Sequence, residues 1–328
     1  MISGKTIFIS PLDWGLGHSS RCVPIIRSLS GKNTVIIGIT KLNASFFDNY
    51  FPDLQKVEVP SYEISYSKKL PLWLKLVSQW PKINAVIKKE KRLLEKIISD
   101  HKINFVISDN RFGLTNKNTH CVFITHQLNI QVPFFSFVAN LINRKYIHRF
   151  NEVWIPDYEN RDLRLSGQLS DSSHIKIPVK YIEPKSALEN FGSKIEKNAK
   201  TDYLILLSGI EPQRSILEKL LIEKFSTSKQ KIVLVRGSNS FLKTKNHTME
   251  LIDFAYGEKL NNLIVNAETV ICRSGFSTLM DLHLLNKKQL ILIPTPGQSE
   301  QEYLAAYWKK KFGARELLQK AIKLYSFR

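Results

Sequence analysis

The stretch Val270-Ile271-Cys272-Arg273-Ser274-Gly275-Phe276-Ser277-Thr278-Leu279-Met280-Asp281-Leu282 joins two hydrophobic patterns. A short apolar run leads into Arg-Ser-Gly, and apolar residues then recur at helical spacing. A parallel strand buried on both faces that turns directly into a helix has this pattern. Ser274 and Gly275 would then open the helix, where main-chain N–H groups can face an anion. The stretch therefore predicts a βα unit with a ligand-binding turn.

The same βα pattern recurs along the chain, with helical periodicity over Pro81–Ser99, Ser215–Phe225 and Gly275–Leu285. Strands are predicted at Thr6–Ser10, Thr34–Ile39, Asn104–Ser108, Cys121–Thr125, Val153–Pro156, Tyr203–Leu207, Lys231–Val235, Thr269–Cys272 and Gln289–Ile293. They stop near Pro156 and restart near residue 201, so we place a hinge within 182–200. The sequence predicts an α/β protein with two Rossmann-like, doubly wound parallel-sheet domains, 1–182 and 183–328, that face a cleft.

Composition limits the class of protein. The chain has 328 residues, of which 43% are hydrophobic and 23% charged, which is enough apolar material for a buried core. It shows neither a membrane-spanning run nor a signal peptide, and its three cysteines are isolated, which favours the cytoplasm. The formal net charge of +19 is spread over the chain and fits nucleic acid, an anionic membrane or a phosphorylated substrate, or merely a Lys-rich genome.

The first predicted strand leads into Gly15-Leu16-Gly17-His18-Ser19-Ser20-Arg21-Cys22. Paired glycines let a ligand approach the backbone at a helix start, but the third glycine and the ribose-binding acid of a dinucleotide site are missing. The positive end of the helix dipole keeps a histidine at position 18 neutral and able to accept a proton. His18 is therefore either a catalytic base or a simple helix cap.

Polar residues also follow the next strands of the first half. Asp109 comes at the end of a predicted strand, and carboxyl ends of parallel strands meet at one edge of the sheet. Asp109 could orient His18, bind a sugar hydroxyl, or cap the turn that follows it. These three alternatives stay open on the sequence alone.

Two segments together identify a resemblance. Residues 15–21 resemble the Gly-x-Gly-His turn of GT-B glycosyltransferases of family 28, and 270–282 with 294–306 resemble the C-terminal signature of that family. The first turn is also similar to that of a UDP-sugar hydrolase of pseudaminic acid biosynthesis. The resemblance implies a GT-B fold and an inverting transferase, in which His18 is the base toward an acceptor hydroxyl.

The resemblance also implies binding roles. The donor, expected to be a UDP-sugar, would contact Ser208, Gly209, Arg214, Phe254, Arg273, Ser274, Gly275, Asp281, Gln298, Gln301 and Glu302. Asp281 stands where the family has Glu for the ribose, and Glu302 replaces a Gln that contacts the donor sugar. The acceptor would contact Gly15, Gly17, His126 and Asn129. With Asp109 added from its position at the end of a strand, His18 and Asp109 are the predicted catalytic pair.

These patterns lead to one hypothesis and several alternatives. We expect transfer of a hexose or N-acetylhexosamine to a glycan or lipid-linked acceptor, with no cofactor, and no metal because an Asp-x-Asp motif is missing. The alternatives are a nucleotide-sugar hydrolase that uses His18 on water, a UDP-sugar 2-epimerase, an inactive sugar-nucleotide sensor, and a basic nucleic-acid-binding protein. No nucleic-acid-binding module is recognised, which disfavours the last.

Two stretches, 68–80 and 133–149, mix Trp, Phe and Leu with Lys and Arg. Such mixtures suit an anionic membrane surface, and they suit ordinary core helices with solvated lysines equally well. The first interpretation predicts a cytoplasmic protein that is peripheral on the inner face of the membrane.

Overall fold

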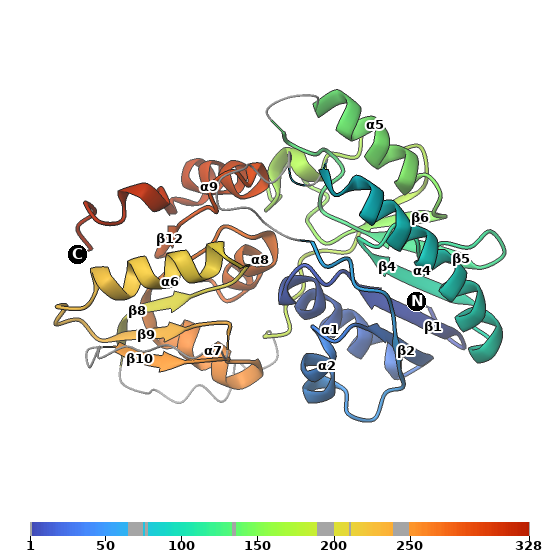
Figure 1. Cartoon of the computed structure of the whole chain (residues 1–328), viewed down its shortest axis with the longest axis horizontal. Helices are drawn as coiled ribbons and strands as arrows, with labels where there is room; N and C mark the ends of the chain where they lie inside the picture. The colour runs from blue at the N-terminus through green and yellow to red at the C-terminus, as the bar shows by residue number, and fades with distance from the viewer. Residues whose placement is uncertain are drawn as a thin grey trace. The chain divides into compact units, whose positions relative to one another are not determined.

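The computed structural model describes residues 2–64, 75, 78–132, 136–188, 200–209, 211–238 and 249–327. The chain divides into two compact units, which are coloured mainly blue to green and yellow to red in Figure 1. Unit 1 comprises Met1–Ile64 and Leu76–Ser186, and unit 2 comprises Ser65–Lys75 and Ala187–Arg328. Part of the predicted hinge, 189–199, and most of the stretch 68–80 lie outside the described residues.

Unit 1 is built on a parallel sheet of seven strands in the order β3-β2-β1-β4-β5-β6-β7. The strands are β1 (Thr6–Pro11), β2 (Thr34–Ile39), β3 (Lys56–Glu58), β4 (Phe105–Asp109), β5 (His120–Ile124), β6 (Glu152–Ile155) and β7 (Val179–Tyr181). The helices are α1 (Leu16–Ser30), α2 (Ala44–Tyr50), α4 (Trp80–His101) and α5 (Ser136–Ile147), with a 3₁₀ turn at Gly167–Ser170.

Helices cover both faces of this sheet, which explains why its central strands are continuous apolar runs. On one face Phe8, Val106 and Phe123 pack with Leu94 and Ile97 of α4. On the other side of the sheet α1 packs against β1 and β2. The strand order reverses between β1 and β4, and such a switch point is where open α/β sheets bind ligands.

Unit 2 repeats this winding with six parallel strands in the order β10-β9-β8-β11-β12-β13. The strands are β8 (Thr201–Leu206), β9 (Ile232–Val235), β10 (Met249–Ile252), β11 (Ala267–Cys272), β12 (Leu290–Leu292) and β13 (Arg315–Glu316). The helices are α6 (Gln213–Lys224), α7 (Gly257–Asn266), α8 (Phe276–Leu284) and α9 (Ser299–Phe312), with a 3₁₀ turn at Gln319–Ala321. Its switch point lies between β8 and β11.

The two doubly wound parallel sheets confirm the predicted α/β class, and each predicted strand is present within a few residues of its expected bounds. One expectation was wrong, because the strands of the first half do not stop near Pro156. Val179–Tyr181 adds β7 beside β6, with Val179 opposite Val153. β7 is short, partly exposed and at the sheet edge, so its residues lack the apolar run by which a central strand is recognised.

Candidate active site

The β1–α1 turn carries His18 at the carboxyl end of the first strand. β1 ends at Pro11, and Gly15 then serves as the N-cap of α1 with φ +99°, a conformation that favours glycine. A Cβ added at Gly15 would meet no atom of the described residues within 4 Å, so these residues leave the space beside the turn open. Gly17 and His18 lie in the first turn of α1, where prediction placed the histidine.

Asp109 lies next to His18 because β4 is the neighbour of β1. The register pairs Pro11 with Asp109, the last residue of β4. His18 Nδ1 is 2.9 Å from Asp109 Oδ1, although 91 positions separate the two residues in the chain. Asp109 is fully buried, whereas the His18 side chain keeps 18% of its surface exposed. The switch point therefore assembles the predicted catalytic pair.

Arg21 joins this pair from one turn further along α1. Its Nε donates to Asp109 Oδ2 at 2.6 Å, and one terminal nitrogen also contacts Asp109 Oδ1. That nitrogen is 2.7 Å from His18 Nδ1, and the other is 3.1 Å from His126 Nδ1. Arg21 belongs to the Gly-x-Gly-His motif, but no role was predicted for it from the sequence. The i, i+3 spacing from His18 could have placed both side chains on one helix face.

Burial and charge set the protonation of this cluster. Burial alone would raise the pKa of Asp109, but Arg21 and His18 outweigh it and hold that pKa well below its ordinary range. Burial has the largest effect on the pKa of His18 and lowers it. The positive charge of Arg21 lowers it further, and Asp109 partly opposes both effects. His18 is therefore neutral at pH 7 beside an ion pair. Burial, with Asp109, raises the pKa of the Cys22 thiol well above its usual value, so Cys22 is not a nucleophile there.

The two other predicted acceptor residues lie beyond β5. His126 is buried and belongs to the cluster through its contact with Arg21. The Asn129 amide donates to the carbonyls of Gln168 at 3.1 Å and Asp171 at 2.7 Å. Asn129 therefore holds the loop that follows the 3₁₀ turn, and its acceptor contact stays a prediction.

In unit 2 the β11–α8 turn has the predicted geometry. Gly275 is the N-cap of α8, and within the described ranges a Cβ added there would meet no atom closer than 4 Å. The Ser274 hydroxyl donates to the Gln301 carbonyl at 2.7 Å, so this side chain turns toward α9. The open element of the turn is therefore its main chain at Gly275, at a helix N-terminus, which is a position that favours an anion.

The Arg273 side chain turns into the fold. Its guanidinium donates to the carbonyls of Ile293 and Pro294, each at 3.1 Å, to the Gln213 carbonyl at 2.9 Å and to Gln319 Oε1 at 2.8 Å. Burial lowers the pKa of Arg273 to about 10, so it stays charged at pH 7. This geometry makes Arg273 a brace for the ends of three elements, and its contact with a diphosphate stays a prediction.

The β8–α6 turn resembles the β11–α8 turn: its glycine is open, whereas its arginine side chain is buried in the fold. Ser208 is exposed, and Gly209 has φ +101° with no described atom within 4 Å of an added Cβ. Arg214, in contrast, is buried in an ion-pair network with Glu211 at 2.7 Å and Glu218 at 3.2 Å. A phosphate would have to compete with these two carboxylates for Arg214.

The remaining predicted donor residues shape the neighbouring turns. Gln298 is the N-cap of α9, and Gln301 Oε1 and Glu302 Oε1 accept the N–H groups of Thr295 and Gly297 at 2.9 Å each. Asp281 is half-buried on α8. Phe254, 36% exposed, stacks on Tyr256 with ring centroids 5.9 Å apart. All of these residues lie in unit 2. Gln298, Gln301 and Glu302 lie at the start of α9, and Phe254 follows β10.

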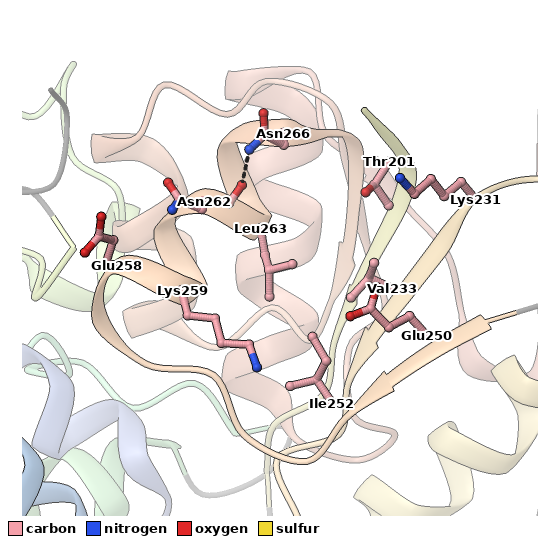
Figure 2. A pocket seen from close by; sticks show the side chains of 10 residues that line it. All are labelled: Thr201, Lys231, Val233, Glu250, Ile252, Glu258, Lys259, Asn262, Leu263 and Asn266. Carbon is pink, nitrogen blue, oxygen red and sulfur yellow. Dashed lines mark hydrogen bonds between the residues drawn. The ribbon is translucent and has the colours of Figure 1, made fainter. Parts of the chain in front are cut away.

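A hollow of about 540 Å³ lies elsewhere in unit 2. Figure 2 shows its lining: Thr201, Lys231, Val233, Glu250, Ile252, Glu258, Lys259, Asn262, Leu263 and Asn266. Thr201 opens β8 and Lys231 directly precedes β9, so much of the hollow adjoins the amino ends of the strands. Ligands of open α/β sheets bind at the carboxyl ends, and none of the predicted site residues lines this hollow.

Comparisons with known proteins agree with this arrangement. Residues 207–327 match the glycosyltransferase family 28 C-terminal domain. Over 330 residues the chain is 23% identical to the UDP-N-acetylglucosamine--N-acetylmuramyl-(pentapeptide) pyrophosphoryl-undecaprenol N-acetylglucosamine transferase of Sulfurihydrogenibium sp. (strain YO3AOP1), covering 96% of this chain and 85% of that protein.

Similar solved structures are glycosyltransferases as well. The glycotransferase of kitacinnamycin superposes with a TM-score of 0.64 at 11% identity, covering 98% of this chain and 87% of the other. SnogD of Streptomyces nogalater gives 0.64 at 13% identity, with 97% and 88% covered. At such identities the likeness shows the fold, which is GT-B.

Proposed function

Because this chain is a glycosyltransferase of family 28 with the GT-B fold, we propose that it transfers a hexose or N-acetylhexosamine from a UDP-sugar to an acceptor hydroxyl, with inversion. The observation that carries this proposal is the His18–Asp109–Arg21 cluster at the switch point of unit 1. Hydrolysis by the same histidine is not favoured, since the matched relative and the similar structures are transferases.

His18 acts as the general base in this proposal. The Asp109 carboxylate only accepts hydrogen bonds, so in this proposal the imidazole proton is on Nδ1, which donates it to Asp109. The Arg21 nitrogen that lies 2.7 Å from Nδ1 then donates to Asp109 and not to the ring. Nε2 then holds the lone pair. As the acceptor oxygen bonds to the anomeric carbon, its proton moves to Nε2 and the bond to UDP breaks on the opposite face. Asp109 stabilises the imidazolium that forms, while Arg21 keeps Asp109 charged.

The donor binds unit 2 in this proposal. Main-chain N–H groups of the turns at Gly209 and Gly275 face the diphosphate, and the helix dipole of α8 favours the negative charge. Asp281 would accept hydrogen bonds from the ribose hydroxyls, and the Phe254 loop would pack against the base. Among the described residues no group of three His, Cys, Asp or Glu side chains could hold a metal ion. Metal independence stays a prediction.

The acceptor side includes an apolar helix face. On α5, Phe137, Val138, Leu141 and Ile142 are exposed by 72%, 48%, 48% and 39%. Arg144 and Lys145 occupy the last turn of the same helix. An apolar face beside basic residues suits an anionic lipid surface, so we propose peripheral membrane binding and a lipid-linked acceptor. No described helix is long and apolar enough to cross a membrane.

Calorimetric titration with UDP and UDP-GlcNAc, with and without EDTA, tests the donor site. We expect micromolar UDP affinity that EDTA leaves unchanged and that falls about tenfold in Asp281→Asn, since a hydrogen bond to a charged group is lost. Asp53→Asn, an exposed carboxylate of unit 1, is the control. If no UDP or UDP-sugar binds, the proposed function is wrong.

Vesicle sedimentation tests the membrane proposal. Phosphatidylglycerol vesicles should bind the protein and phosphatidylcholine vesicles should not, because the attraction is partly electrostatic. Phe137→Asp should abolish the binding, whereas Leu42→Asp should leave it unchanged, because Leu42 is similarly exposed, at 64%, but lies outside α5. Equal binding by both variants would reject α5 as the contact surface.

A further inference from the structure

The β1–α1 turn contains two adjacent buried polar groups for which the described part of the chain supplies no hydrogen-bond partner. Both carboxylate oxygens of Asp13 and the indole Nε1 of Trp14 are shielded and unbonded. Asp13 is only 6% exposed. Buried polar groups are nearly always paired, because an unmade hydrogen bond costs free energy, and more so for a charged group. An unmatched acceptor and an unmatched donor side by side indicate that a ligand completes them.

Neighbouring donors are committed to other acceptors. Trp14 packs edge-on against Tyr62, with ring centroids 6.3 Å apart, and the Tyr62 hydroxyl donates to Glu90 Oε2 at 2.8 Å. Arg111 donates to Glu90 Oε1 at 2.8 Å and to the carbonyls of Pro11 and Pro60. Tyr62, Glu90 and Arg111 therefore satisfy one another and nearby carbonyls without a hydrogen bond to Asp13. No described residue donates to the Asp13 carboxylate, and the neighbouring cluster already pairs its own charges.

The chemistry of these groups defines the ligand class. Two carboxylate oxygens match neighbouring hydroxyl groups, an indole N–H matches a ring or hydroxyl oxygen, and an indole face suits the apolar face of a sugar ring. A flat acceptor with a single hydroxyl cannot satisfy both Asp13 oxygens. Gly15, the next residue, leaves open space beside the turn.

We propose that Asp13 and Trp14 bind the sugar ring of the acceptor, a step that rests on the proposed function. Asp13 accepts hydrogen bonds from two ring hydroxyls, and Trp14 donates one to an oxygen of the same sugar. A ring held in this way offers a further hydroxyl to Nε2 of His18. His18 lies five residues after Asp13, in the first turn of α1. Asp13 orients the acceptor and takes no part in the proton transfer.

Ligand-observed NMR and calorimetry with methyl β-D-glucopyranoside and methyl 2-acetamido-2-deoxy-β-D-glucopyranoside test this proposal, each with and without UDP. Wild-type protein should bind at least one of the two. Asp13→Asn should weaken that binding about tenfold or more, and Trp14→Phe several-fold, because each loses a hydrogen bond that only the ligand satisfies. Asp53→Asn should bind as the wild type does.

Thermal unfolding separates ligand binding from a structural role. Asp13→Asn should melt at or above the wild-type temperature, because it removes a buried charge that has no partner. A lower melting temperature with unchanged sugar affinity would overturn the proposal, as would a wild-type protein that binds neither glycoside. Should Asp13→Asn fail to fold, Trp14→Phe decides, since it keeps the ring and removes one N–H.

UDP titration of the same variants keeps the two proposals apart. Asp13→Asn and Trp14→Phe should bind UDP with wild-type affinity, because donor binding is assigned to unit 2. Glycoside binding that depends on Asp13, in a protein that does not bind UDP, would leave the sugar site standing and defeat the proposed transfer. Loss of UDP affinity in both variants would overturn the acceptor assignment.

Discussion

The strands β4 and β11 hold the same place in their two sheets, and each leads into a buried charge. Asp109 ends β4, and Arg273 directly follows β11. The partners of Asp109 are side chains, among them a histidine whose second nitrogen can take up a proton. The partners of Arg273 are mainly main-chain carbonyls, which titrate in no accessible range.

This difference shows how one topology can support two kinds of site. Both strand ends need their buried charge satisfied, since an uncompensated one would be costly. In unit 1 the compensation is built from titratable side chains, and in the proposed function this turn presents a base. In unit 2 the Arg273 and Arg214 side chains brace the fold, and in the proposed function the main chain of the turns at Gly209 and Gly275 binds the ligand. Substitutions at the two turns should therefore have different effects.

The largest effect is expected at His18. His18→Ala should lower kcat by roughly 10²–10⁴-fold, because proton removal from the acceptor loses its base. UDP affinity by calorimetry should stay at the wild-type value, since the donor contacts are assigned to unit 2. A variant that keeps its UDP-release rate with acceptor present would contradict the role of the unit 1 turn.

Asp109→Asn should lower kcat about tenfold or more and also change its pH dependence. Activity needs neutral His18, so the acid limb falls where pH drops through the lowered His18 pKa. Asp109 raises that pKa, so its removal lowers it further and moves the limb to lower pH. The full pH profile of kcat is the measurement. A drop in kcat with the limb unmoved would show that Asp109 only maintains the structure.

Gly275→Val tests whether main chain forms the donor site. The new side chain meets no protein atom near its Cβ, so the melting temperature should change little, whereas UDP affinity should fall by at least about tenfold. Gly113→Ala is the control for a glycine whose replacement creates a clash inside the protein and not in the donor site. A Cβ there would lie 2.5 Å from Glu90 Oε2 and from the Ile87 carbonyl, so it should lower stability without changing UDP affinity in the folded protein. Unchanged UDP affinity in Gly275→Val would show that the main chain of this turn does not bind UDP.

Arg273→Met should act mainly on stability. Its loss leaves the carbonyls of Ile293, Pro294 and Gln213 without their donor, which should cost about 2–4 kcal/mol in the free energy of unfolding. Urea unfolding measures this cost, and UDP affinity of the folded variant should change less than threefold. Wild-type stability with lost UDP affinity would instead make Arg273 a diphosphate ligand and remove the contrast between the two units.

The sequence could predict the central strands and the turns after them. β1, β4 and β11 are covered on both faces, so their apolar runs stand out, and glycines mark the turns that follow. The edge strands β3, β7, β10 and β13 escaped prediction because they are short, and most of their residues are partly exposed. Position within the sheet, which the local sequence does not carry, is what makes them strands.

For the site, the sequence by itself determined which residues could do chemistry, because a histidine after paired glycines and a Ser-Gly turn before a helix are local patterns. Only the tertiary structure decided the partners. β1 and β4 become neighbours through the strand order, which joins His18, Arg21 and Asp109. Packing likewise turned Arg273 and Arg214 into internal braces and left Asp13 without a donor among the described residues, because hydrogen-bond partners are set by distances between elements that are remote in the chain.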